Sequence, residues 1–246
     1  MSTSFQRDQL VENLKSAVNS VASAEAAWLG GSRATGSEDA LSDTDMVVVS
    51  LNPEAVFSRV EEVLQSKYGI ERIWSLQGGL WKGFVQKFYV LSNTPEFYYV
   101  DFGIFVTDQA VDLAEFFNQD RHGKADILWD KSGILQRASE LTTAEKATLP
   151  GASQHAQFEI LYRTFLKESL RGKYIDAFLF YQRLVGLFVN LLRLRHSPQK
   201  HDFGLRYLYK DLPLQDSKRI EDILKAAVDI SSMQKCAAEM RQEYLR

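Results

Sequence analysis

A short run of β-branched residues constrains the fold more than any other part of the sequence. Residues 44–51, TDMVVVSL, contain three consecutive valines and end at Asn52-Pro53, a pattern that predicts a strand buried inside a sheet. Upstream, AAWLGG at residues 26–31 predicts a second short apolar strand ended by glycine. The polar residues 31–42 must therefore form a loop between two core strands.

The rest of the first half alternates between helical and extended patterns. Apolar residues at helical spacing predict helices over residues 4–23 and 54–67, the second stopped by Gly69. The expected strands and turns are IERIWSL (70–76), a hairpin of GFVQKFYVL (83–91) and EFYYVDFGIFV (96–106) around SNTP, and a last strand and turn in ADILWDKSG (125–133). Residues 111–125 are expected to be a short helical or irregular stretch.

The pattern changes near LPGASQ, residues 149–154. Beyond it we expect three long helices and no strand, and the middle one is apolar almost all round, as the central helix of a bundle would be. The expected helices are 155–171, 173–196 and 215–245. The pattern thus predicts an α/β module over residues 1–148, followed by an α-helical module over residues 149–246.

Composition limits the classes of partner. The chain of 246 residues has a net charge of −3, whereas proteins that grip long nucleic acids usually carry a basic field, so we expect a small-molecule substrate. Cys236 is the one cysteine, which excludes an intramolecular disulfide and a zinc site of several thiolates. The start of the sequence lacks the apolar core of a signal peptide, and no stretch approaches roughly 18 uncharged apolar residues. A cytoplasmic protein without a membrane partner is expected.

The glycine-rich loop does not match the common phosphate-binding motifs. Gly31 to Gly36 fits G-x-x-x-x-G, but Ser37 and Glu38 follow it where a Walker loop needs Lys and Ser or Thr. The G-x-G-x-x-G of a dinucleotide-binding turn and the G-x-S-x-G of a hydrolase are also absent there. A Gly-Gly-Ser turn that leaves a strand remains, with backbone N–H groups able to form an anion-binding nest.

Three aspartates accompany this turn. Asp43 and Asp45 stand at i and i+2 at the start of a buried strand, so both carboxylates lie on one face with Cα atoms about 6.5 to 7 Å apart. Asp101 lies within the apolar strand YYVDFGIFV, where a carboxylate is costly unless a cation or hydrogen bonds compensate it. The alternative for the first pair is an ordinary turn or capping role. Three carboxylates beside a phosphate nest favour a divalent cation, and Mg²⁺ prefers such oxygen ligands.

Gly30-Gly31-Ser32, Asp43-Thr44-Asp45 at the start of an apolar strand, and Asp101 on a later strand together resemble the nucleotidyltransferase superfamily related to DNA polymerase β. The motif covers about residues 28–106. The trailing helices and the length resemble the aminoglycoside and lincosamide nucleotidyltransferases, members that modify antibiotics. The resemblance implies an α+β fold, with a catalytic domain of a mixed sheet and flanking helices over residues 1–148 and a substrate-binding domain, an α-helical bundle, over residues 149–246.

The resemblance also implies a reaction. A nucleoside monophosphate would pass from a nucleoside triphosphate, with ATP as the expected donor, to a hydroxyl of a small molecule such as an aminoglycoside or lincosamide, and pyrophosphate would be released. Two Mg²⁺ ions would assist, because phosphoryl transfer depends on positioning and charge neutralisation.

Each motif residue then has an expected role. Asp43 and Asp45 would bind both ions, while Asp101 would bind the ion nearer the attacking hydroxyl or act as general base. Gly30, Gly31 and Ser32 would hold the phosphates. Arg33 either adds a charged contact or is simply solvated.

Residues of the second half are weaker candidates. Glu159 is a candidate base on the acceptor side, although no motif selects it over Glu168. Lys200 and Arg206 belong to a basic segment, residues 193–210, that either faces a triphosphate or is a solvated helix end. Several aromatic residues either stack on a base or form core and hairpin pairs: Trp74, Trp81, Phe84, Phe88 and Tyr89.

Two other functions stay open. In the second reading, a nucleotidyltransferase of this kind modifies a partner protein or RNA, as toxin–antitoxin members do, although the low pI disfavours RNA. A catalytically silent nucleotide-binding regulator is the third reading, and the intact aspartates argue against it. The sequence leaves the oligomeric state open, with a homodimer among the options.

Overall fold

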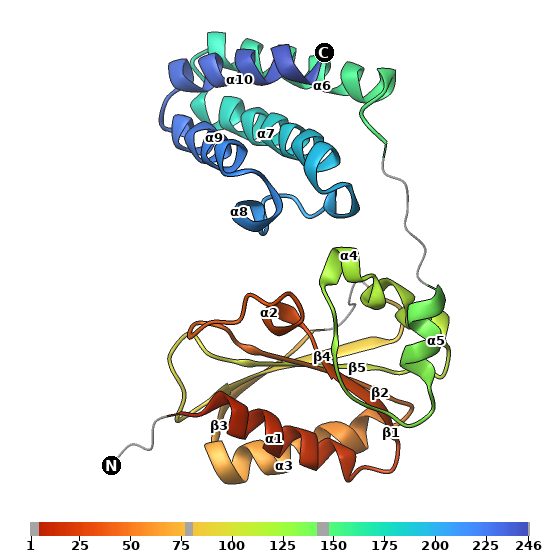
Figure 1. Ribbon diagram of the computed structural model, residues 1–246. Helices are drawn as coiled ribbons and strands as arrows, with labels where there is room; N and C mark the ends of the chain where they lie inside the picture. Colours follow the sequence, from red (N-terminus) through yellow and green to blue (C-terminus); the bar gives the residue numbers. More distant parts are fainter. Residues whose placement is uncertain (1–4, 77–80, 142–147, 246) are drawn as a thin grey trace. The chain divides into compact units, whose positions relative to one another are not determined.

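The computed structural model describes residues 5–76, 81–141 and 148–245 (Figure 1). The chain divides into two compact units, unit 1 over Met1–Thr143 and unit 2 over Ala144–Arg246. The sequence placed the division a little later, after residue 148. The roles assigned to the two units, catalysis and substrate binding, stay predictions.

Unit 1 is built on a six-stranded mixed sheet with the strand order β3-β4-β5-β2-β1-β6. The parallel pair is β2 with β5, and the other neighbours run antiparallel. The strands are β1 (Ala24–Leu29), β2 (Thr44–Ser50), β3 (Ile70–Leu76), β4 (Phe84–Leu91), β5 (Val100–Phe105) and β6 (Asp126–Asp130). The valine-rich strand β2 therefore lies between two other strands, which is the place that its buried pattern predicts.

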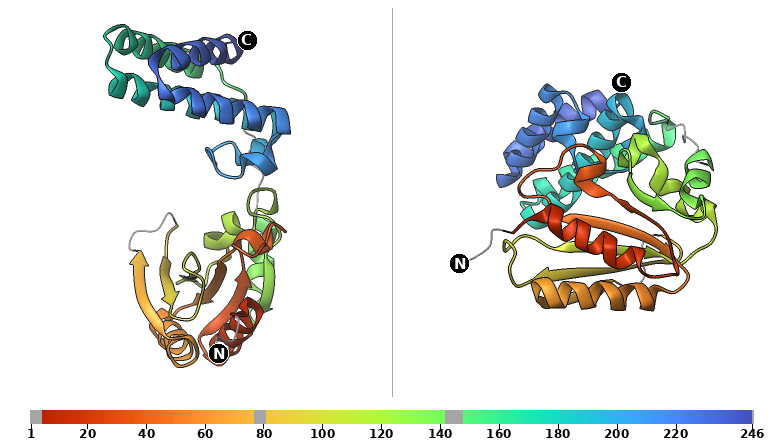
Figure 2. Two further views of the ribbon diagram at one scale, coloured as in Figure 1. Left: turned by 90° about the vertical axis from the view of Figure 1, so that its left-hand side faces the viewer. Right: turned by 60° about the horizontal axis from the view of Figure 1, so that its bottom comes forward.

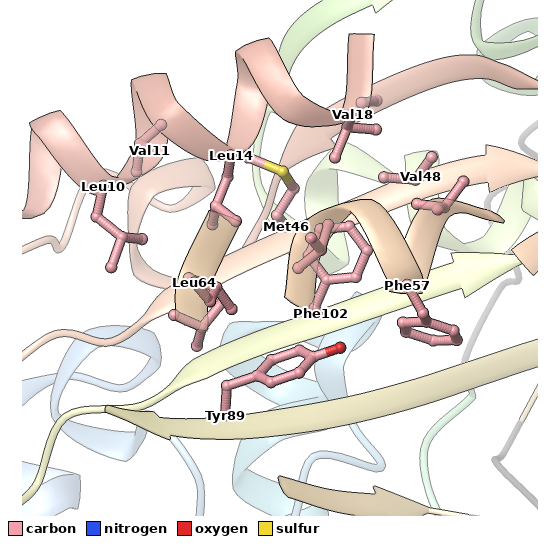
Figure 3. Packing of buried hydrophobic residues seen from close by; sticks show 14 of the residues in the cluster. Leu10, Val11, Leu14, Val18, Met46, Val48, Phe57, Leu64, Tyr89 and Phe102 are labelled. Carbon is pink, nitrogen blue, oxygen red and sulfur yellow. The ribbon is translucent and has the colours of Figure 1, made fainter. Parts of the chain in front are cut away.

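Helices α1 (Arg7–Asn19) and α3 (Pro53–Tyr68) cover one face of this sheet (Figures 1 and 2). Leu10, Leu14 and Val18 recur at helical spacing on α1 and pack onto Met46 and Val48 of β2 (Figure 3). The ends of α3 follow the sequence signals. Its N-cap residue Asn52 accepts a hydrogen bond from the Ala55 amide, Pro53 is its first residue, and Gly69 ends it with a positive φ of 70°.

A second apolar cluster covers part of the opposite face. Its residues come from β1, β2, β4 and β5, from the 3₁₀ helix η1 (Ala110–Phe117) and from α5 (Ile134–Leu141). Phe84 packs so closely on β5 that a Cβ at Gly103 would lie 2.2 Å from its Cζ atom. This face also carries α2 (Gly31–Ala34) and α4 (Gln119–His122), seen above the sheet in Figure 1.

Unit 2 is helical over the residues described, 148–245, as the sequence predicted. Its main helices are α6 (Ala152–Leu170), α7 (Tyr174–His196), α9 (Leu214–Lys225) and α10 (Ile230–Tyr244), joined by η2 (Pro198–Lys200), α8 (Leu208–Asp211) and η3 (Ala226–Val228). The single helix expected over 215–245 is wrong. Asp229 has extended backbone angles and accepts a hydrogen bond from the Ser232 amide, so it caps a new helix and separates α9 from α10.

Helix α7 is the centre of the unit 2 core, with Tyr181, Leu184 and Phe188 buried among the other helices. Among the described residues it is the one helix long and apolar enough to cross a membrane by length and composition, with a mean hydropathy of 1.4. Of its apolar stretch, 44% is buried, and these residues pack in the core of unit 2.

Most of the other expected elements are confirmed, with shifted ends. The helix expected over 4–23 ends at Asn19, and β1 begins at Ala24. Within the stretch 111–125, the irregular structure is η1 followed by α4. Helix α5 was not predicted. Its first turn is capped by Asp130, whose carboxylate accepts hydrogen bonds from the Leu135 and Gln136 amides.

Candidate functional site

The Gly-Gly-Ser turn is packed directly against Asp45. The Gly30 amide donates to the Asp45 carbonyl at 3.1 Å, as a continuation of the β1–β2 pairing. Gly31 has a positive φ of 56°, and a Cβ on it would lie 1.8 Å from Asp45 Oδ2. Only glycine fits at this position, for its backbone angle and for the space. The Asp45 carboxylate therefore lies over the backbone of the turn that begins α2.

Asp45 and Asp101 lie side by side in the sheet. Strands β2 and β5 are parallel, and their register pairs Asp45 with Asp101. Residues paired in this way point to the same side of a sheet. That side is opposite to α1 and α3, because Val47 and Val49, which alternate with Asp45, belong to the cluster with η1 and α5.

Asp43 and Tyr99 directly precede β2 and β5 in the chain. The hydrogen bond from the Tyr99 hydroxyl to the Asp43 carboxylate raises the pKa of Tyr99, and burial and the charges of Asp43, Asp45 and Asp101 raise it further. The charges of all three aspartates therefore raise the pKa of the same hydroxyl group, that of Tyr99. On the other face, the buried Thr44 and Tyr98 hydroxyls lie 2.7 Å apart and tie this end of β2 to the chain that enters β5.

Asp101 is partly buried on β5 beside Asp45. Burial raises the pKa of its carboxyl group to about 6, a hydrogen bond from Gln86 opposes the rise, and the Asp43 charge adds to it. Gln86 Nε2 donates to Asp101 Oδ1 at 2.5 Å from the neighbouring strand β4. A carboxylate with such a raised pKa, beside a second carboxylate, is typical of functional sites.

A small pocket lies at this end of β2, with room for about one water molecule at about 10 Å³. Its polar lining includes five of the predicted residues together with Glu38: Gly30, Ser32, Arg33, Asp43 and Asp45. Arg33 already has acidic neighbours, because its Nε atom lies 3.1 Å from Asp126 Oδ2 and its Nη1 atom 3.7 Å from Asp8 Oδ1.

The three aspartates are not arranged as a closed metal site. Within the described ranges, no group of three His, Cys, Asp or Glu side chains stands ready to hold a metal ion. Asp43 and Asp101 are instead hydrogen-bonded to the neutral donors Tyr99 and Gln86. The donor set is still one that suits Mg²⁺, which takes carboxylate oxygens together with water and phosphate oxygens.

The candidates in unit 2 are held by partners within that unit. Glu159 accepts a hydrogen bond from Arg241 and lies 3.6 Å from Arg163. Lys200 donates to Asp211 at 2.8 Å. Arg206 is exposed, and its guanidinium lies 4.9 Å from the centre of the Tyr207 ring and donates to the Tyr207 hydroxyl.

The basic segment 193–210 is partly a structural network. Arg193 is fully buried and donates to Asp211 at 2.8 Å and to the backbone carbonyls of Gly204 and Arg206. The Asp211 carboxylate thus pairs with both Arg193 and Lys200. These ion pairs hold the segment that follows α7 against that helix. Neither of the two interpretations of this segment, a triphosphate contact or a solvated helix end, anticipates the buried Arg193–Asp211 pair.

The predicted aromatic residues separate into two groups. Tyr89 and Phe84 are buried in the two cores of unit 1, and Trp81 packs on Phe84 with ring centroids 5.7 Å apart, so these three form core pairs. Phe88 is only partly buried and Trp74 is 48% exposed.

Sequence reasoning missed Gln86 and Tyr99 as site residues. Tyr99 precedes Asp101 by two positions, so strand alternation alone places it on the same face. To place Gln86 beside Asp101, the exact register of the β4–β5 hairpin must be known, and the length of the turn does not determine it.

Comparison with known proteins does not identify a family for this chain. No model of a known protein family matches the chain, and no curated protein sequence gives a significant match.

Proposed function

We propose that this chain is a Mg²⁺-dependent nucleotidyltransferase, which moves a nucleoside monophosphate from a nucleoside triphosphate, with ATP as the expected donor, to a hydroxyl of a small molecule in the cytoplasm. One observation carries the proposal: the Gly30-Gly31 turn packs on Asp45, which is in register with Asp101 on the adjacent parallel strand. Backbone amides for phosphate and carboxylates for a cation thus meet at one end of the sheet.

The chain's own residues supply binding and orientation. Gly31, Ser32 and Arg33 form the turn that begins α2, and their backbone amides would donate to the β- and γ-phosphates. The pocket there has room for about one water, so a triphosphate would lie over it rather than inside it.

Asp43 and Asp45 are assigned to both metal ions and Asp101 to the ion nearer the attacking hydroxyl. The raised pKa of Asp101 supports this, because a nearby cation compensates a buried negative charge. Bound Mg²⁺ would neutralise charge that develops on the phosphate oxygens. The alternative role for Asp101, whose carboxyl pKa is raised to about 6, is to accept the hydroxyl proton.

Pyrophosphate release tests the proposal. ATP, GTP, CTP and UTP are each incubated with Mg²⁺ and with a panel of aminoglycosides, lincosamides and simple polyols. We expect release that depends on one nucleotide and one acceptor class, and its loss in Asp45→Asn, which keeps the shape of the side chain. The matched control is Asp108→Asn, because Asp108 is an exposed carboxylate in the same unit.

A wild-type rate in Asp45→Asn would remove the metal-ligand assignment. Mg²⁺-dependent nucleotide binding without release across the panel would favour the macromolecular acceptor or the silent regulator. Absence of both binding and release would reject the proposed function.

A further inference from the structure

One row of side chains runs across four strands of the sheet. The register pairs Asp45 with Asp101, Asp101 with Phe88, and Phe88 with Trp74. Because paired residues share a face, these four side chains lie on the face that carries α2, in the order of the strands β2-β5-β4-β3. The aspartates occupy one end of the row and the aromatic residues the other.

The apolar cluster on this face ends before that row. Val47, Phe84 and Phe105 are buried under η1 and α5, whereas Phe88 and Asp101 are only partly buried and Trp74 is 48% exposed. Tyr99 extends the aromatic surface, with its ring 5.7 Å from that of Phe88. We name Trp74, Phe88 and Tyr99 the aromatic shelf.

The geometry of nucleotidyl transfer determines which of the two substrates the aromatic shelf would bind. The acceptor oxygen forms a bond to the α-phosphorus, the bond from that phosphorus to the β-phosphate oxygen breaks, pyrophosphate leaves and the hydroxyl proton goes to a carboxylate or to solvent. The attacking and leaving oxygens are roughly in line on opposite sides of the phosphorus. With the β- and γ-phosphates at the Gly31 turn, which follows β1, the acceptor must approach from the side of β5, β4 and β3.

We propose that the aromatic shelf is the acceptor subsite, and that the acceptor is a small molecule with a flat apolar ring joined to the ring that carries the reacting hydroxyl. This inference rests on the proposed function. Neighbouring strands lie about 4.8 Å apart, so Asp101 and Trp74 are about 10 Å apart across the sheet, which suits a molecule of two rings. Aromatic side chains stack on flat apolar faces, and the Arg72 guanidinium already lies over the Trp74 ring, 5.7 Å from its centre.

A pair of simple probes tests the shelf by direct binding. Calorimetry on the full chain, with Mg²⁺ and an α,β-methylene analogue of ATP, compares 4-nitrophenyl β-D-glucopyranoside with methyl β-D-glucopyranoside. Both carry the same sugar hydroxyls, and only the first carries a flat second ring. We expect the aryl glycoside to bind roughly tenfold more tightly.

Trp74→Ala and Phe88→Leu should abolish that preference and leave the affinity for the Mg²⁺–nucleotide analogue unchanged. The matched control is Ile73→Ala, which removes a 40% exposed apolar side chain from the same strand but from its other face. Intact folding of each variant is checked by circular dichroism.

Equal affinity of the wild-type chain for the two glycosides, or a preference that survives in Trp74→Ala, would overturn the shelf assignment while nucleotide binding stays intact. A lower nucleotide affinity in Trp74→Ala would also overturn it, because the shelf would then bind the nucleobase. Failure of the wild-type chain to bind the Mg²⁺–nucleotide analogue would instead reject the proposed function.

Discussion

Asp101→Asn should make unit 1 more stable at neutral pH, although it removes a residue assigned to catalysis. Burial raises the pKa of this carboxyl group to about 6, from an ordinary value of 3.8. Each unit of pKa corresponds to about 1.4 kcal/mol, so a charged Asp101 costs folding about 3 kcal/mol. Asparagine carries no charge, has nearly the same shape, and its Oδ1 atom can still accept the hydrogen bond from Gln86.

The pH dependence gives the sign of the effect. The folded-state pKa lies above the unfolded-state value, so the charged form destabilises the fold fully above pH 6, and this penalty fades as the pH falls toward 3.8. The variant should therefore exceed the wild type by about 3 kcal/mol at pH 8, about 1.5 kcal/mol at pH 5 and about 0.5 kcal/mol at pH 4.

Urea unfolding followed by tryptophan fluorescence measures this difference. All four tryptophans, Trp28, Trp74, Trp81 and Trp129, lie in unit 1, so their emission reports that unit alone. The buffer contains EDTA to remove divalent cations, and Asp108→Asn is the control for loss of an exposed carboxylate. A variant no more stable than the wild type at pH 8, or a gain that does not change with pH, would show that the Asp101 charge does not destabilise the fold.

Two further substitutions test the packing around the site and the second unit. Gly31→Ala should destabilise unit 1 by more than Gly36→Ala does, and it should abolish turnover. Both glycines have positive φ, but only a Cβ at Gly31 would lie against Asp45. Urea unfolding measures the stability of each variant, and pyrophosphate release measures turnover. Asp211→Asn should destabilise unit 2 by about 3 to 5 kcal/mol, because it leaves the buried Arg193 without its counter-charge; circular dichroism follows this unfolding.

Each of these has a contrary outcome. Equal destabilisation by the two alanine substitutions would show that backbone strain alone acts at the turn. For unit 2 the control is Lys225→Met, which breaks the exposed Glu221–Lys225 pair on α9 and should leave unfolding unchanged. An Asp211→Asn variant as stable as that control would contradict the structural role of the buried network.

The parts of the fold that depend on local signals were predictable. Strand β2 and helix α3 follow from a β-branched run and from an Asn-Pro start with a glycine stop. The break between α9 and α10 was missed because the apolar spacing continues across it, and the Asp229 cap that interrupts it resembles an ordinary exposed aspartate in the sequence. Spacing alone did not separate one long helix from two.

The candidate site was likewise predictable only where it depends on residues that are neighbours in the sequence. The Gly-Gly-Ser turn and the placement of Asp43 and Asp45 at the start of β2 are visible in neighbouring residues of the sequence. The pairing of Asp45 with Asp101, and of Asp101 with Phe88, depends on the register between strands distant in the chain. For the same reason, the burial of Arg193 against Asp211 could not be read from a run of basic residues.

Calorimetric titration with ATP tests most directly whether the Gly31 turn together with Asp43, Asp45 and Asp101 forms a metal–triphosphate site. It needs no knowledge of the acceptor. We expect ATP to bind the wild-type chain in Mg²⁺, and we expect this binding to be lost in EDTA and in Asp45→Asn but not in Asp108→Asn. Binding that is equal in Mg²⁺ and EDTA, or equal in wild type and Asp45→Asn, would contradict this expectation.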